Sequence, residues 1–307
     1  MSKGQCASRI QVWAPAKLNL YLEILSRRPD GFHELDTVMT AISLYDTLSV
    51  RPNPGSPQIA FSIRTSLGNS QSAESASVET VPADHTNLIV RAAQLLQSRS
   101  GTDQGAAIHL IKRIPVAAGL GGASSDAAAT LVACNELWKL GWQRERLAEL
   151  AAQLGSDVPF FIYGGTATCR GRGEIIHPMP ARPCQHFVVA KPPVGLSTAD
   201  VYGACEVPRK PQQRDIAELK HFVARNRLQH AAQRLTPWIG QLAAAFSHSG
   251  ARYHGMSGSG TSYFAICANA AAAFRLRRRL ISRKIGRVFY AHGDCRIRSR
   301  LREPNLN

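Results

Sequence analysis

The chain has 307 residues, of which 44% are hydrophobic and 19% charged, and its formal net charge is +16. This composition is typical of globular proteins, and the length suffices for two domains with a core each. No apolar stretch approaches the roughly 20 residues that span a bilayer, and the first residues lack the apolar segment of a signal peptide. The seven cysteines are scattered and form no CxxC pair. We therefore expect reduced thiols and a cytoplasmic protein that does not enter a membrane.

The first third of the chain predicts mainly β-structure. Apolar residues and turn signals favour strands over 11–25, 46–52 and 58–64. Residues 65–86 are rich in serine and alanine and contain almost no large apolar side chain, so they are expected to form a mobile surface loop. A helix is expected over about 87–99, with Asn87 as its N-cap, and AAIHLIKRI should form the next strand.

The stretch KRIPVAAGLGGASSDAAATL, residues 112–131, places glycines directly before an alanine-rich run. Glycine is poor in helices and alanine is the best helix former, so helices are expected over about 124–139 and then 144–154. Glycines let backbone N–H groups converge on a ligand, and a helix N-terminus adds unpaired N–H groups and partial positive charge. An anion site, most often for phosphate, is favoured, with a tight strand-to-helix turn as the alternative. The loop matches neither Walker A nor G-x-G-x-x-G.

The C-terminal half begins with a strand at QHFVVAKPP and continues with helices over 215–249, a glycine-serine turn at 255–260, a strand, a basic helix and a final strand. Strands and helices mix without strict βαβ alternation, which favours an α+β fold in two parts.

Between 275 and 302 there are eleven Lys or Arg residues and one acid. The helical spacing of apolar residues predicts that the basic face is solvated, with polyanion binding as the alternative; the expected apolar face consists of Phe274, Leu276, Leu280 and Ile281.

Three further stretches carry polar residues in places that favour a site. APAKLNLYLEI sets Lys17 and Asn19 on one face of a strand with apolar neighbours, where an exposed face is the alternative. LGSDVPFFIYGG sets Asp157 at a turn before an apolar run; taken alone, such an aspartate is usually a helix cap or turn residue. HGMSGSGTSYFAI is a turn of small residues that forms either a plain hairpin or a backbone wall beside a ligand.

Together, these stretches resemble the GHMP kinase superfamily over nearly the whole chain. PAKLNL resembles its first motif, IPVAAGLGGASSDAA its phosphate-binding second motif, and GMSGSGTSYF its glycine-rich third motif. The resemblance implies an α+β, two-lobed fold, with a ribosomal-S5-like N-terminal domain over 1–180, a ferredoxin-like C-terminal domain over 181–307 and the site in the cleft. Family loops commonly have a further glycine where this chain has Ala117, Ala118 and Ala123, and the serine-rich stretch differs from relatives in length and composition.

The resemblance also implies ATP-dependent phosphorylation of an alcohol. Asp157 matches the catalytic aspartate and would accept the hydroxyl proton, while Lys17 would keep that carboxylate ionised and polarise the attacked hydroxyl. Asn19 would orient the substrate. Mg²⁺ should arrive with the nucleotide, because no dense carboxylate cluster suggests a protein-only metal cage. The residues expected to hold the ATP phosphates are Pro115, Val116, Ala117, Ala118, Gly119, Leu120, Gly121, Gly122, Ala123, Ser124 and Ser125.

Within the superfamily, the likeness is closest to kinases that phosphorylate the 2-hydroxyl of a cytidine diphosphate-linked methylerythritol in the non-mevalonate isoprenoid pathway. This closer likeness rests on three stretches: PAKLNLYLEILSRRPDGFHELDTV, NLIVRAA and GSDVPFF. It implies that Phe32 and Tyr202 flank the cytosine and that His33 contacts the polar edge of the base, presented by the Asp30–Gly31 turn. Core or turn packing of Phe32 is the alternative.

Two other functions stay open. The chain could be another GHMP kinase, acting on homoserine, mevalonate or a sugar, but the stretch DGFHELDT has no obvious purpose in those relatives. It could also be a non-catalytic basic protein that binds polyanions. Intact Lys17 and Asp157 argue against that function, so we expect a small-molecule partner rather than a nucleic acid.

Overall fold

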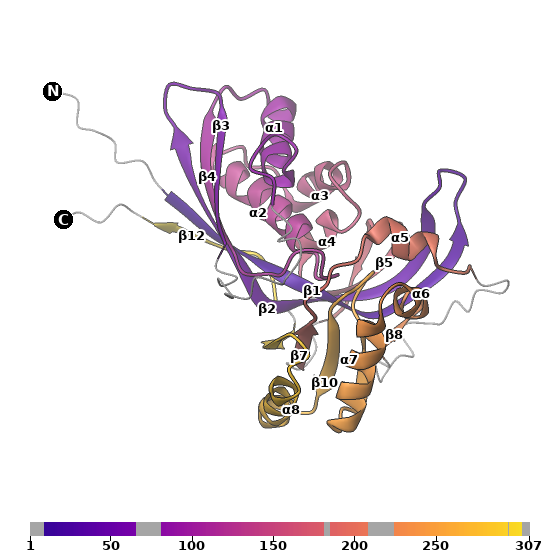
Figure 1. Ribbon diagram of the computed structural model, residues 1–307. Coiled ribbons are helices and arrows are strands. Elements are labelled where there is room, and N and C mark those ends of the chain that lie inside the picture. Colours follow the sequence, from indigo (N-terminus) through magenta and orange to yellow (C-terminus); the bar gives the residue numbers. More distant parts are fainter. Residues whose placement is uncertain (1–8, 66–80, 181–184, 208–223, 294, 303–307) are drawn as a thin grey trace.

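The computed structural model describes residues 9–65, 81–180, 185–207, 224–293 and 295–302 (Figure 1). Most of the serine-rich stretch and the beginning of the helical region expected over 215–249 lie outside the described residues. Within them, strands and helices build two sheets with separate helical layers. The predicted α+β fold in two parts is confirmed.

Two long antiparallel strands form the centre of the larger sheet: β1 (Arg9–Arg27) and β2 (His33–Asn53). They pair along their length with irregular register, including a shift between Asn19 and Tyr21. Such a bulge reverses the alternation of side chains along a strand. As a result, Lys17 and Asn19, which precede the bulge, and Leu22, which follows it, all line the same cavity between the two halves of the protein. The bulge therefore brings polar residues and an apolar residue of one strand to the same cavity.

The other strands of this sheet flank the central pair. The order is β12–β1–β2–β4–β3, while β5 pairs with β2 and β6, and β8 pairs with β1. Their bounds are β3 (Ile59–Thr65), β4 (Gly105–Lys112), β5 (Thr166–Gly171), β6 (Ile175–Pro178), β8 (Arg225–Asn226) and β12 (Arg298–Arg302). Because β8 and β12 come from the C-terminal half, the chain returns twice to the first sheet. The domain boundary near residue 180 stays a prediction.

Four helices cover one face of the large sheet (Figure 1). They are α1 (Leu88–Ser100), α2 (Gly122–Leu137), α3 (Arg144–Ala152) and α4 (Val158–Tyr163). The alanine-rich helix α2 is buried along most of its length, because small side chains let it approach its neighbours closely. Asn87 caps α1 as predicted, since its side chain accepts a hydrogen bond from the backbone N–H of Ile89 at 2.9 Å.

The second sheet has the order β11–β7–β10–β9, all antiparallel. Its strands are β7 (His186–Lys191), β9 (Tyr253–Met256), β10 (Tyr263–Cys267) and β11 (Arg287–His292), and the helices of this half are α5 (Thr198–Gly203), α6 (Gln229–Leu235), α7 (Pro237–His248) and α8 (Ala270–Ser282). A core that includes Leu18 and Leu20 of β1 and Phe187 and Phe264 of the small sheet joins the two halves. The cleft between them is thus held by apolar packing.

The apolar face predicted for the basic helix α8 is partly wrong. Leu276 and Leu280 are buried, but Phe274 and Ile281 are 53% and 46% exposed. Ala273 takes the remaining buried place. The buried stripe is therefore narrower than predicted, and the Phe274 ring lies instead against Tyr290, with 4.6 Å between ring centroids. No helix in the described part of the chain is long and apolar enough to cross a membrane. Cys134, Cys169, Cys205 and Cys267, which lie in that part, form no disulfide.

Candidate active site

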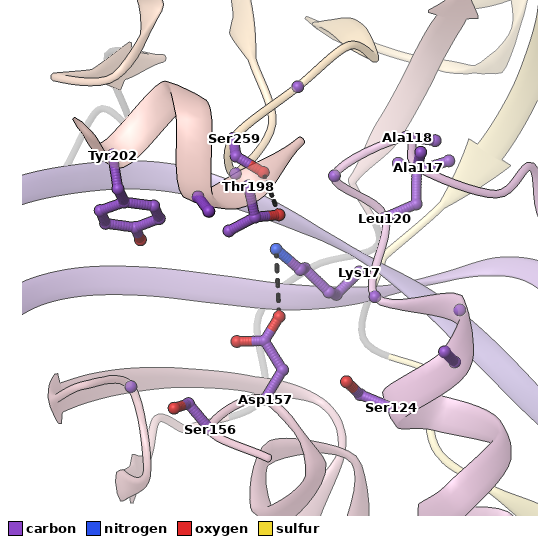
Figure 2. Close-up of a pocket in the computed structure, with 18 of the residues that line it drawn as sticks. Lys17, Ala117, Ala118, Leu120, Ser124, Ser156, Asp157, Thr198, Tyr202 and Ser259 are labelled. Carbon is purple, nitrogen blue, oxygen red and sulfur yellow. Dashed lines mark hydrogen bonds and ion pairs between the residues drawn. The ribbon is translucent and has the colours of Figure 1, made fainter. Parts of the chain in front are cut away.

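A cavity of about 1130 Å³ lies in the cleft. Its walls come from β1, β2, the glycine-rich loop before α2, the start of α4, α5 and the turn between β9 and β10 (Figure 2). All four stretches that the sequence analysis selected contribute to this cavity. Positions far apart in sequence are thus brought together at one site.

Lys17 and Asp157 face each other across the middle of the cavity (Figure 2), with 3.5 Å between Nζ and the nearer carboxylate oxygen. The Lys17 side chain is only 5% exposed, whereas that of Asp157 is 33% exposed. Asp157 occupies the N-cap position of α4, yet its side chain makes no capping hydrogen bond. Its carboxylate is therefore aimed at the lysine and the cavity rather than committed to the helix.

Asn19 completes a short polar chain with Lys17. Lys17 Nζ donates a hydrogen bond to Asn19 Oδ1 at 2.5 Å, and Asn19 Nδ2 donates to Thr37 Oγ1 at 2.9 Å. All three side chains are buried. The predicted placement of Lys17 and Asn19 on one face of a strand is confirmed, and the exposed-face alternative is wrong.

The glycine-rich loop enters α2 through Gly121, which has φ +68° at the N-cap position. No side chain caps this helix, so its first N–H groups remain available to a ligand. Ala117 has φ +44°, a left-handed conformation that glycine adopts at less cost. This strain lies at one of the positions where the resemblance noted in the sequence led us to expect a further glycine in related loops. Ten of the eleven predicted loop residues line the cavity, while Ser125 is fully buried and does not.

The turn between β9 and β10 packs directly against this loop. Ser262 N donates to Ala118 O and Ser257 Oγ donates to Gly119 O, both at 3.0 Å. A Cβ on Gly119 would lie 2.1 Å from the carbonyl oxygen of Ser257, which explains why this position needs glycine. The turn also lines the cavity through residues 258–260, so it is both a hairpin and a backbone wall.

A buried ion cluster behind the loop escaped the sequence analysis. Lys112 Nζ lies 2.6 Å from a carboxylate oxygen of both Asp46 and Asp126, and all three are almost fully buried. Burial raises the pKa of Asp126 well above its usual range, although Lys112 acts in the opposite direction. Burial alone would lower the pKa of Lys112, but the two carboxylates outweigh it and the pKa is raised. The cluster joins β2, β4 and α2 beneath the loop.

The opposite end of the cavity is aromatic. Phe32 N donates to Asp30 Oδ1 at 3.1 Å and Gly31 has φ +84°, so the expected turn forms. The rings of His33 and Tyr202 pack against each other, with 5.3 Å between their centroids. Phe32 is 51% exposed, and the guanidinium of Arg172 lies over its ring, 4.8 Å from the ring centroid. The sequence reasoning missed Arg172.

Both polar rings at this end are neutral near pH 7. Partial burial, assisted by Arg27, lowers the pKa of His33, while burial, assisted by Asp157 and Cys205, raises the pKa of Tyr202. A neutral imidazole has one donor and one acceptor nitrogen, and a phenol can do both. These groups suit the edge of a planar heterocycle that offers mixed donors and acceptors.

Comparison with known proteins defines the class. The description "GHMP kinases N terminal domain" matches residues 87–165, and "GHMP kinases C terminal" matches residues 209–285. The chain belongs to the GHMP kinase family, whose members are ATP-dependent small-molecule kinases.

Curated relatives carry a more specific name. The chain is 42% identical over 269 residues to the 4-diphosphocytidyl-2-C-methyl-D-erythritol kinase of Geobacillus thermodenitrificans, covering 84% of this chain and 88% of the relative. It is 39% identical over 280 residues to the kinase of the same name from Brevibacillus brevis, covering 87% and 91%.

Solved structures agree with this relationship. A crystal structure of 4-(cytidine 5'-diphospho)-2C-methyl-D-erythritol kinase matches with a TM-score of 0.75 and 33% identity, covering 93% of this chain and 99% of that chain. A homoserine kinase from Cytophaga hutchinsonii matches with a TM-score of 0.72 but only 17% identity, covering 97% and 99%, so it shows the fold alone.

Proposed function

We propose that this chain transfers the γ-phosphoryl group of ATP to the 2-hydroxyl of 4-diphosphocytidyl-2-C-methyl-D-erythritol, a step in non-mevalonate isoprenoid biosynthesis. One observation carries the proposal: the Lys17–Asp157 pair lies in a single cavity between a glycine-rich helix N-terminus and an aromatic, hydrogen-bonding end. Such a cavity suits a nucleoside triphosphate and an alcohol that carries a base. The names of the relatives agree with this substrate.

Phosphoryl transfer to an alcohol needs a positioned proton acceptor and fixed positive charge. Asp157 accepts the proton of the attacked hydroxyl, because its carboxylate is partly exposed to the cavity and not used as a cap. Lys17 supports the ionised carboxylate and polarises the hydroxyl, and Asn19 orients the substrate. The backbone from Pro115 to Ser124 holds the ATP phosphates, with the start of α2 facing them.

Mg²⁺ is expected to enter with the ATP phosphates. Among the described residues there is no group of three or more His, Cys, Asp or Glu side chains that could hold a metal ion. Two oxygen groups at the start of α2 nevertheless fit this hard cation: the hydroxyl of Ser124, and Asp126 Oδ1, which is buried beside the cavity and has no hydrogen-bond partner among the described residues. These residues would receive the metal, which supplies charge neutralisation to the phosphates.

At the base end, Phe32 and Tyr202 flank the cytosine and His33 contacts its polar edge. Homoserine and mevalonate carry no base and would leave this end of the cavity unused. A non-catalytic polyanion-binding function would likewise leave the Lys17–Asp157 pair without a role. The cytoplasmic location and the absence of a nucleic-acid partner stay predictions.

The test is a phosphotransfer assay with the purified full chain and ATP, comparing the cytidine diphosphate-linked methylerythritol with homoserine and mevalonate. We expect turnover with the cytidine substrate alone. Faster phosphorylation of homoserine or mevalonate would contradict the proposal, and so would ATP-dependent turnover of none of the three.

A further inference from the structure

Thr37 makes two hydrogen bonds that together fix the orientation of a neighbouring amide. Its Oγ1 donates to the backbone carbonyl oxygen of Tyr21 at 2.6 Å and accepts from Asn19 Nδ2 at 2.9 Å. A hydroxyl has a single proton, and a carbonyl can only accept. Because the proton is used on Tyr21, Thr37 presents only a lone pair to Asn19, and the NH₂ group of the amide must face it.

This orientation determines what Lys17 meets on the other side of the amide. With the NH₂ group on Thr37, Asn19 Oδ1 faces Lys17 Nζ at 2.5 Å, and the same ammonium lies 3.5 Å from Asp157. A flipped amide would set two donor groups against each other where both residues are only 4% exposed. Buried donors without acceptors are costly, so Thr37 and Lys17 together favour the unflipped state, and loss of the Thr37 hydroxyl would leave the buried NH₂ group of Asn19 without this acceptor.

We propose that Thr37 is a positioning residue that holds Lys17 in line with Asp157 through the amide of Asn19. The inference rests on the proposed function for its kinetic consequences, but not for the amide orientation itself. Thr37 is 2% exposed in the middle of β2, paired with Leu22 on one side and Cys169 on the other. Its position is therefore set by the sheet and not by a ligand.

Two variants separate the role of the Thr37 hydroxyl from the role of its side-chain volume. Thr37→Val keeps the volume and removes the hydroxyl, whereas Thr37→Ser keeps the hydroxyl and its hydrogen bonds. Thr40→Val is the matched control: Thr40 is a fully buried threonine of the same strand whose hydroxyl contacts Thr166 at 2.9 Å, and it does not line the cavity. In the full chain, we expect Thr37→Val to lower kcat by about 10- to 100-fold, the order expected from a small misplacement of a catalytic group. The KM for ATP should stay within twofold, and Thr37→Ser and Thr40→Val should stay within threefold of wild type.

A double-mutant cycle tests the route through the amide. Once Asn19 is replaced by Ala, adding Thr37→Val should change kcat by less than threefold. Additive losses, a wild-type kcat for Thr37→Val, or an equal loss in Thr37→Ser would each overturn the proposal.

A second readout needs no substrate. Hydrogen exchange of the Asn19 side-chain amide, followed by NMR, should be slow in wild type and Thr37→Ser and faster in Thr37→Val. Unchanged exchange in Thr37→Val would also overturn the proposal. Failure of the wild type to phosphorylate the cytidine substrate would contradict the proposed function. The exchange measurement would still show whether Thr37 holds the amide of Asn19.

Discussion

The two ends of the cavity differ in how they are held. At the phosphate end, defined here as the loop from Pro115 to Ser124, a buried Lys112 cluster lies below and the β9–β10 turn presses against the loop backbone. At the base end, defined as Phe32, His33 and Tyr202, one ring is 51% exposed and contacts are made chiefly by rings and an arginine. The phosphate end is built into the core, whereas at the base end Phe32 and His33 lie on a surface turn and only Tyr202 lies on a helix, α5.

The difference follows from what each end binds. A phosphate is held by backbone N–H groups whose directions must be fixed in advance, because buried donors pre-ordered by packing need no rearrangement when charge develops. A base is held largely by stacking, which tolerates small movements of the rings. We therefore expect changes at the phosphate end to affect folding as well as activity, and changes at the base end to affect substrate affinity alone.

The largest effect is expected between the two ends, at Asp157. Asp157→Asn keeps the shape of the side chain but removes the proton acceptor, and should lower kcat by about 10²–10⁴-fold. ATP binding, measured by calorimetry, should change little because the phosphate end is untouched. Asp103→Asn, in an exposed loop outside the cavity, is the control and should be neutral. A kcat within a few-fold of wild type would make Asp157 a turn residue only.

Replacing Lys112 tests the built-in character of the phosphate end. Lys112→Met leaves two buried carboxylates without their cation, and should lower the free energy of unfolding by about 3–5 kcal/mol. Lys139→Met removes an exposed lysine and should cost less than about 0.5 kcal/mol. Denaturant unfolding at pH 7 measures both.

The pH dependence of the Lys112→Met variant gives an independent check. Burial raises the pKa of Asp126 in the folded state above its unfolded value. The folded state therefore binds the Asp126 proton more tightly than the unfolded state does. The stability that this proton contributes is lost as pH rises through the pKa of the folded state. The variant should recover stability as pH falls through the raised pKa of Asp126 towards the ordinary range of a carboxyl group. A pH-independent loss would mean that Asp126 does not carry the effect.

A pair of glycines separates backbone strain from close packing at the loop. Gly119 and Gly141 have nearly the same φ, +69° and +67°, but a Cβ would meet the Ser257 carbonyl at 2.1 Å only at Gly119. Gly141→Ala should lower the free energy of unfolding by about 1–2 kcal/mol through strain alone. Gly119→Ala should cost about 1–3 kcal/mol more and weaken ATP binding. Equal losses in the two variants would mean that the loop moves away from the turn freely.

At the base end, two half-exposed phenylalanines form a matched pair. Phe32 lines the cavity and Phe274 does not, while their exposed fractions are 51% and 53%. Phe32→Ala should raise the KM for the cytidine substrate by about 5- to 150-fold, the equivalent of roughly 1–3 kcal/mol of stacking. The KM for ATP and the melting temperature should stay near wild type. Phe274→Ala should leave both KM values unchanged; a Phe32→Ala variant that loses stability instead would favour a packing role.

The sequence predicted those parts of the fold and site that depend on neighbouring residues. Asn87 caps its helix and Gly31 shapes its turn because both act on backbone within a few positions. The Lys112 cluster was missed because one of its two carboxylates, that of Asp46, comes from another strand 66 residues away. Thr37 ended the quoted stretch DGFHELDT, but nothing local distinguishes a strand threonine that orients an amide from one that only packs. Such contacts depend on strand pairing, which the spacing of residues does not specify.

The smallest effect concerns proton binding at His33. Partial burial and Arg27 lower its pKa below the usual 6.5, so the ring is neutral at pH 7 and one nitrogen can accept a hydrogen bond from the exocyclic amine of cytosine. Uracil has a carbonyl at that position and cannot donate. As pH falls through the lowered pKa, both ring nitrogens become donors and this discrimination is lost. We expect the ratio of kcat/KM for cytidine over uridine substrates to be constant at neutral and alkaline pH and to fall, as pH drops through the lowered pKa of His33, by about 2- to 12-fold, the value of one net hydrogen bond. The ratio cancels the titration of ATP itself. His33→Ala should show the low-pH ratio at every pH, and a wild-type ratio in that variant would remove His33 from base recognition.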